Sequence, residues 1–157
     1  MKNLYIKTLM AVLAMFGMSI LLAGCGGGGG GGSSAVEDLL LARMRSFGDG
    51  MRARSTSRTM SNFSRDYYDN GITYEEYRDA MDAFFRAGGQ AWFENLQGHE
   101  WSSDGAYAVR RFSTWFVTKI DGNTERYWLD ALEYFHRENG KWLIYGSQSD
   151  SRAPDSK

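Results

Sequence analysis

The chain has 157 residues, 15% of them aromatic, and a formal net charge of −1 at pH 7. It lacks the basic footprint of nucleic-acid-binding proteins, so we expect no nucleic-acid partner. Cys25 is the only cysteine, which excludes an intramolecular disulfide. With only His99 and His136 besides, we expect neither a metal site nor a cofactor. The length leaves room for one compact domain.

The N-terminus begins with a short basic stretch containing Lys2 and Lys7, followed by an apolar run over 8–22. This order is typical of a signal peptide, and the run is shorter than the roughly 20 residues of a membrane-spanning helix. The residues Leu22-Ala23-Gly24-Cys25 resemble the lipobox of bacterial lipoproteins. The resemblance implies cleavage after Gly24, a diacylglycerol thioether on Cys25 and usually an acylated amino end. A plain secretory signal is the alternative.

We therefore expect a signal peptide over 1–24 and a lipidated cysteine with a Gly/Ser tether over 25–34. The nine residues after Cys25 span at most roughly 30 Å, which keeps the following domain near its membrane. The expected location is the cell envelope, lipid-anchored on the extracytoplasmic side. Because glycine rather than aspartate follows Cys25, the outer membrane facing the periplasm is favoured if the organism is Gram-negative.

The helical half follows the tether. A capping box at Ser34 and Glu37, followed by an apolar residue at every third or fourth position, predicts a first helix. We expect a break or kink in it near Gly48 and Gly50. A shorter second helix is expected over 59–68. Its inward-facing side chains would be Met60, Phe63 and Tyr67.

A third helix has the clearest local signature. Thr73 and Glu76 form a second capping box, and Gly88-Gly89 marks its end. Tyr77 is among the residues that we expect on its inner face.

From Gln90 the apolar period changes from 3.6 to 2, which predicts strands over 91–102, 106–119, 124–138 and 141–149. Asp104-Gly105, Asp121-Gly122 and Asn139-Gly140 separate them and suit tight hairpins. The expected fold is α+β, with three N-terminal helices packed on a curved four-stranded antiparallel sheet. This domain would cover 35–149, followed by a disordered tail over 150–157.

The element order and the final hairpin, Glu138-Asn139-Gly140-Lys141-Trp142-Leu143-Ile144-Tyr145, resemble the nuclear transport factor 2-like superfamily. That superfamily includes SnoaL-like polyketide cyclases and ketosteroid isomerases, and the resemblance implies a cone-shaped fold. One departure is expected, because Asn70 to Ile72 leaves little room for the short strand that often precedes the third helix. Other α+β sheets stay open as alternatives.

Two-residue turns at Asp121-Gly122 and Asn139-Gly140 fix the register and divide the sheet into two apolar faces. One face carries Phe112, Phe116, Tyr127, Leu129, Phe135, Trp142 and Ile144. The other carries Trp115, Val117, Trp128, Leu132, Tyr134, Leu143 and Tyr145. Helices cover only one of them, so a homodimer through the second face is a possible partner interaction, in line with the resemblance.

The same register makes Arg110 and Glu133 cross-strand partners, with His99 beside Arg110 if the Asp104-Gly105 hairpin is equally tight. On a concave, helix-covered face these three residues would line a cavity. The Glu133 carboxylate would then act as a general base, and Arg110 would hold an anionic ligand. The competing interpretation is a simple Arg110–Glu133 salt bridge near the sheet edge, with His99 exposed.

These features favour a membrane-anchored extracytoplasmic lipoprotein that acts as a small-molecule-binding or accessory module and is not an enzyme. Its ligand would be small and either apolar or anionic. Two alternatives stay open. One is an isomerase-, cyclase- or hydratase-type enzyme using an acid in the cone. The other is a structural envelope lipoprotein whose cone is filled by its own aromatic side chains.

Overall fold

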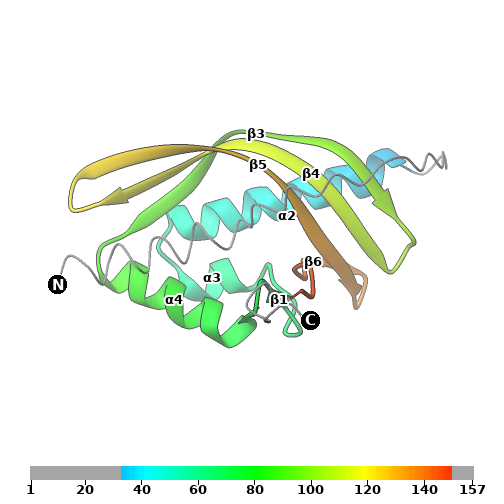
Figure 1. The fold of residues 1–157 in the computed structure, drawn as a ribbon, viewed down its shortest axis with the longest axis horizontal. Helices are drawn as coiled ribbons and strands as arrows, with labels where there is room; N and C mark the ends of the chain where they lie inside the picture. Colours follow the sequence, from blue (N-terminus) through cyan, green and yellow to red (C-terminus); the bar gives the residue numbers. More distant parts are fainter. Residues whose placement is uncertain (1–32, 150–157) are drawn as a thin grey trace, which may run out of the picture.

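The computed structural model describes residues 33–149. The signal peptide, Cys25, most of the tether and the tail over 150–157 lie outside the described residues. Within these residues, three helices lie on one side of a four-stranded antiparallel sheet with the order β3-β4-β5-β6 (Figure 1). The sheet curves over the helices, and a two-stranded hairpin, β1-β2, closes one end. The predicted α+β architecture is confirmed.

Helix α2 (Ser33–Arg52) is continuous and begins one residue before the predicted cap. The predicted break near Gly48 and Gly50 is therefore wrong. Both glycines are contact points: a Cβ at Gly48 would lie 2.8 Å from the Phe93 ring, and one at Gly50 would lie 2.7 Å from the Thr59 backbone nitrogen. Close packing of the helix thus offsets the roughly 1 kcal/mol that each glycine costs in a helix.

Helix α3 (Thr56–Met60) is capped by Ser55 and ends well before residue 68, so the predicted second helix is placed wrongly. The backbone after it bonds to strand β6 instead of continuing a helix. Ser64 donates to the Ile144 carbonyl, and the Ile144 amide donates to the Asn62 carbonyl. The three side chains predicted to face inward from this region are nonetheless buried: Met60, Phe63 and Tyr67.

The hairpin of β1 (Tyr68–Asp69) and β2 (Ile72–Thr73) occupies the place where no strand was expected. Its turn is Asn70-Gly71, with φ angles of 49° and 77°. These are the left-handed values of a two-residue hairpin turn, so pairing begins immediately on either side of the two residues. The expected departure from the superfamily pattern is therefore wrong.

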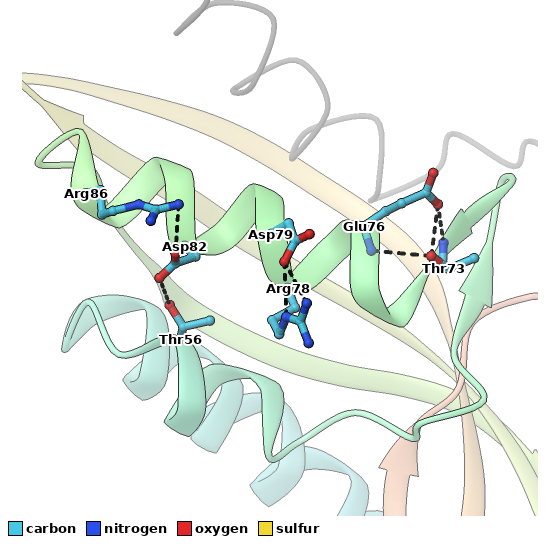
Figure 2. Close-up of polar contacts among 7 residues, drawn as sticks. All are labelled: Thr56, Thr73, Glu76, Arg78, Asp79, Asp82 and Arg86. Carbon is cyan, nitrogen blue, oxygen red and sulfur yellow. Dashed lines mark hydrogen bonds and ion pairs between the residues drawn. The ribbon is translucent and has the colours of Figure 1, made fainter.

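Helix α4 (Tyr74–Arg86) begins at the predicted capping box, where Glu76 N–H donates to Thr73 Oγ1 and Thr73 N–H donates to Glu76 Oε2 (Figure 2). Thr56 Oγ1 donates to Asp82 at 3.1 Å, and Asp82 also pairs with Arg86 at 2.8 Å. Asp82 therefore connects α3 to α4. The helix ends before Gly88, whose φ of +83° suits glycine.

The main sheet consists of β3 (Gln90–Ser103), β4 (Tyr107–Ile120), β5 (Asn123–Glu138) and β6 (Lys141–Ile144). The first three strands match their predicted ranges within a residue or two. Strand β6 ends five residues early, because the chain over 145–149 pairs with β1. Tyr68 N–H donates to the Tyr145 carbonyl, and Gln148 N–H donates to the Tyr68 carbonyl.

The two sheet faces divide as predicted. The inner face packs against the helices through buried residues that include Phe112, Phe116, Phe135, Trp142 and Ile144. On the outer face, Trp128 is 54% exposed, Leu132 46% and Trp115 37%. Among residues 33–149, no helix has the length and apolar character needed to cross a membrane.

Candidate functional site

Glu133 lies on β5, on the inner face of the sheet, directly opposite Arg110 of β4 as the register predicted. It is only partly exposed. Its carboxyl group makes no hydrogen bond or ion pair with any other residue among 33–149. A carboxyl group in this position is costly to ionise, and such groups are concentrated at functional sites.

Two tyrosines of the helical layer interact electrostatically with Glu133. Tyr67 comes from the segment before β1 and is 6% exposed, whereas Tyr77 comes from the start of α4 and is 2% exposed. Their ring centroids are 5.7 Å apart, and Phe63 packs against both at 5.1 and 4.9 Å. Neither hydroxyl has a hydrogen-bond partner within residues 33–149. The sheet and the helices thus bring one carboxyl and two phenols together on an aromatic base.

The electrostatics of this cluster keep its members protonated. Burial raises the pKa of Glu133 to about 8, and the nearby Asp69 carboxylate adds to the effect. Burial also raises the pKa of Tyr67 and Tyr77, with a further contribution from Glu133. At neutral pH Glu133 is therefore mostly a neutral acid, which can donate one hydrogen bond and accept another.

Asp69 has hydrogen-bond partners of its own. The Ser147 amide donates to Asp69 Oδ1 at 3.0 Å, and the Ser147 hydroxyl donates to the same oxygen. Asn70 donates to Oδ2 at 3.1 Å. Asp69 is thus a satisfied carboxylate that joins β1 to the chain after β6, and it acts on Glu133 through space.

Arg110 does not pair with Glu133, so the simple cross-strand salt bridge is wrong. Its side chain, 6% exposed, extends towards α2, where Nη1 donates to the Glu37 carbonyl and Nη2 lies 3.7 Å from the Glu37 carboxylate. The guanidinium also lies over Phe112 at 5.5 Å and above Gly98, where a Cβ would be 2.3 Å from its nitrogens. Because Gly98 has no side chain, the Arg110 side chain has room to pass over it and reach Glu37.

His99 is not part of this cluster, which corrects the expectation that it lies beside Arg110. The β3–β4 turn is longer than two residues, since Ser103 pairs with Ala108, and Trp101 therefore faces Arg110. Register irregularities on both sides of Gly98 then leave His99 exposed, with its Nε2 2.5 Å from the Ser113 hydroxyl. Tight turn residues alone did not reveal this longer loop.

The sequence predicts Glu133 as a site residue, whereas Tyr67 and Tyr77 occupy positions typical of a core and no sequence pattern points to Asp69. The sequence does contain an indication of their role: Tyr67 and Tyr77 carry hydroxyl groups at inward-facing positions where phenylalanine would pack equally well. The described residues contain no cluster of three or more His, Cys, Asp or Glu able to hold a metal ion. Ligand binding by Glu133, Arg110 and His99 stays a prediction.

No protein-family model matches the chain, and no curated protein matches it. Its structure is similar to that of a conserved Planctomyces limnophilus protein, with a TM-score of 0.62 and 15% identity over 71% of this chain and 92% of that one. A candidate scytalone dehydratase from Novosphingobium aromaticivorans gives a TM-score of 0.58 and 9% identity, covering 71% of this chain and 80% of that one.

A third similar structure is a candidate dehydratase of the nuclear transport factor 2-like family from Streptomyces avermitilis. Its TM-score is 0.53 at 11% identity, over 71% of this chain and 93% of that one. At such identities the likeness shows the fold alone. The chain therefore has a nuclear transport factor 2-like fold.

Proposed function

We propose that this protein is a lipid-anchored extracytoplasmic module that binds a small, neutral, partly apolar molecule next to Glu133. The observation that carries the proposal is an inner-face carboxyl group without a protein partner, flanked by the two phenols of Tyr67 and Tyr77. Leaving a polar group of this kind unpaired costs about 1–3 kcal/mol, which a hydrogen-bonding ligand would recover.

The chemistry of the cluster favours a neutral ligand over an anionic one. Arg110, the cation closest in register, is bound to Glu37, and Glu133 is mostly protonated at neutral pH. A carbonyl or hydroxyl group of the ligand would pair with Glu133, while its apolar part packs on Phe63 and its neighbours. Aromatic side chains with a few polar groups are typical of small-molecule sites.

The experiment uses the mature chain with Cys25→Ser, purified from its own organism and measured by native mass spectrometry. We expect a co-purifying small molecule that is retained in Arg110→Lys and lost in Glu133→Leu. Glu133→Leu keeps the apolar packing and removes both hydrogen-bonding oxygens. A chain that is ligand-free throughout, or a ligand retained by Glu133→Leu, would contradict the proposal.

A dehydratase-type or isomerase-type enzyme is the second candidate, and the pKa of Glu133 supports it. A general acid or base works best when its pKa is close to the working pH, and the pKa of Glu133 is about 8. In a dehydration, protonated Glu133 would give its proton to a leaving hydroxyl group, which departs as water. The resulting carboxylate would accept the proton lost from the neighbouring carbon, which balances the reaction.

Membrane anchoring rests on the lipobox alone. The proposed attachment residue is Cys25, and the helical domain begins at Ser33, so a short glycine segment separates the two. Two or three acyl chains contribute about 0.8 kcal/mol for each buried CH₂, which makes such an anchor effectively permanent.

A homodimer through the outer sheet face is part of the proposal. Trp115 and Trp128 pack edge to face at 5.4 Å, and with Leu132 they leave an exposed apolar area across β4 and β5. Large exposed apolar areas of this kind mark interaction surfaces. A second copy of the chain would cover the area by a two-fold contact.

A further inference from the structure

A groove on the outer face of the sheet, whose lining does not include Glu133, has the properties of a second binding site. Its volume is about 490 Å³, within the roughly 300–1,000 Å³ range of small-molecule sites. The side chains that give it its chemical character are aromatic or polar: Ser102, Asp104, Tyr107, Tyr134, Tyr145 and Gln148. It lies where the β3–β4 loop meets the chain that follows β6.

Two residues that line the groove, Tyr107 and Tyr145, belong to an aromatic cluster with His136. Tyr107 stacks on His136 with a centroid distance of 4.6 Å and an interplanar angle of 16°, and Tyr145 contacts both rings at 5.7 and 5.2 Å. Tyr145 N–H donates to the Tyr134 carbonyl, which places the Tyr134 main chain beside Tyr145, and Tyr134 also lines the groove. Because Tyr107 and Tyr145 touch, the rings form one continuous surface and not a cage around a ligand.

Both walls are fixed before any ligand arrives. On one side, Asp104 Oδ1 accepts from the amides of Ala106 and Tyr107, and Ser103 Oγ donates to the Tyr107 carbonyl. On the other side, the chain after β6 is bonded to β1, and the Gln148 side chain donates to the Tyr145 carbonyl at 2.8 Å. A preformed site loses less conformational entropy when it binds.

The polar atoms left over define the ligand chemistry. Within residues 33–149, the Tyr134 and Ser102 hydroxyls, Asp104 Oδ2 and Gln148 Oε1 have no hydrogen-bond partner. Two of these four are pure acceptors and two are hydroxyls, so they suit a ligand rich in hydroxyl donors. Asp104 is the only charged residue among the described ones that line the groove, and backbone donors lower its pKa, which disfavours an anionic ligand.

From this combination we infer that the groove binds a neutral carbohydrate, a sugar or short oligosaccharide whose apolar ring face stacks on Tyr107 and Tyr145. Sugar hydroxyls would donate to Asp104 and Gln148 and exchange hydrogen bonds with Tyr134. This inference does not depend on the Glu133 site.

The groove shares the outer face with the proposed dimer contact, and Leu132 of that contact is two residues from Tyr134 of the groove, but the two tryptophans of the contact lie further along the strands. Trp115 is eight positions further along β4 than Tyr107, which at about 3.3 Å per residue corresponds to roughly 26 Å. A second copy seated on Trp115 and Trp128 would leave Tyr107 accessible.

The test is isothermal titration calorimetry of the mature Cys25→Ser chain with three neutral probes: cellotriose, maltotriose and triacetylchitotriose. We expect saturable binding of at least one probe with a Kd of about 1 mM or tighter. Tyr107→Ala should abolish it. Tyr134→Phe, which removes a single hydroxyl, should weaken it about threefold to tenfold.

The matched control is Trp92→Phe, an aromatic change on the same face near the far end of β3, which should leave the affinity unchanged. Folding of each variant is checked by circular dichroism. Tetramethylammonium is a fourth probe, because aromatic surfaces also attract cations. Absence of binding to all three sugars, binding of tetramethylammonium only, or sugar binding that Tyr134→Phe and Tyr107→Ala both retain would overturn the inference.

Discussion

Arg110 and Glu133 are directly opposite each other on β4 and β5, yet they form no ion pair. Arg110 extends across Gly98 to Glu37 of α2, and Glu133 stays beside Tyr67 and Tyr77. A buried charge without a partner destabilises the folded state, and these two residues do not pair with each other. Arg110 is stabilised instead by its contacts with Glu37 of α2. Glu133 has no such compensation among residues 33–149, and this difference makes it the candidate functional group.

Stability should depend on pH through Glu133. Its pKa is raised from 4.5 to about 8 in the folded chain, so the folded state binds this proton more tightly than the unfolded state. The folded state is therefore favoured below pH 4.5 by this group, and the advantage is lost progressively between pH 4.5 and 8. The total is at most about 5 kcal/mol.

Urea unfolding of the wild type and of Glu133→Gln at several pH values measures this effect. The variant lacks the titration, so its stability relative to the wild type should rise as the pH increases from 4.5 to 8. A constant difference between the two proteins over this range would show that Glu133 titrates normally.

Gly98→Ala should destabilise the protein. The added Cβ would lie 2.3 Å from the Arg110 guanidinium, which must then leave Glu37 or displace β3. We expect a loss of about 1–3 kcal/mol, as for overpacked sites. The control is Glu100→Ala at an exposed position two residues further along β3, which should change the unfolding free energy by less than about 0.5 kcal/mol. Equal stability of Gly98→Ala and wild type would contradict the proposed path of Arg110.

The capping box of α4 should contribute measurably to stability. Thr73→Ala removes the acceptor for the Glu76 amide (Figure 2) and should cost about 1 kcal/mol. Thr73→Ser keeps the hydroxyl group and should cost much less. Thermal unfolding of both variants measures the difference, and equal losses would mean that the hydroxyl is not the cause.

The outer-face dimer has a direct test. The mature Cys25→Ser chain should sediment as a dimer at micromolar concentration, and Trp128→Asp should sediment as a monomer because it places a charge in the apolar contact. Thermal unfolding shows whether the variant is folded. A monomeric wild type would remove the dimer from the proposal.

Lipid attachment is tested in cells. Metabolic labelling with an alkyne fatty acid should mark the wild-type chain in the membrane fraction, and Cys25→Ala should be unlabelled. Retention of the label in Cys25→Ala would contradict lipidation at this residue.

Much of the sheet could be predicted from the sequence because a tight turn is formed by residues that are adjacent in the chain. Asn139-Gly140 and Asp121-Gly122 adopt two-residue turns, so counting outwards from them placed Arg110 opposite Glu133 correctly. The third turn failed, because the loop after Ser103 is longer and β3 contains two irregularities near Gly98. The position of His99 depends on these non-local features.

The helical errors have a similar origin. The low helix propensity of glycine predicted a break in α2. The helix stays continuous because Gly48 and Gly50 are where it packs closely against Phe93 and Thr59. The second helix ended early because its backbone bonds to β6, a partner about 80 residues away in sequence. Tyr67 and Tyr77 were recognised as inward-facing, but their relation to Glu133 depends on how the two layers pack.

The most direct test of the central proposal is the pKa of Glu133 in the ligand-free mature Cys25→Ser chain, measured from its side-chain ¹³C carboxyl signal by NMR. The signal is assigned by its loss in Glu133→Gln. We predict a pKa near 8, because the carboxyl is desolvated and lies near Asp69. A value near 4.5 would show an ordinary solvated carboxylate and would contradict a partnerless acid poised for a ligand.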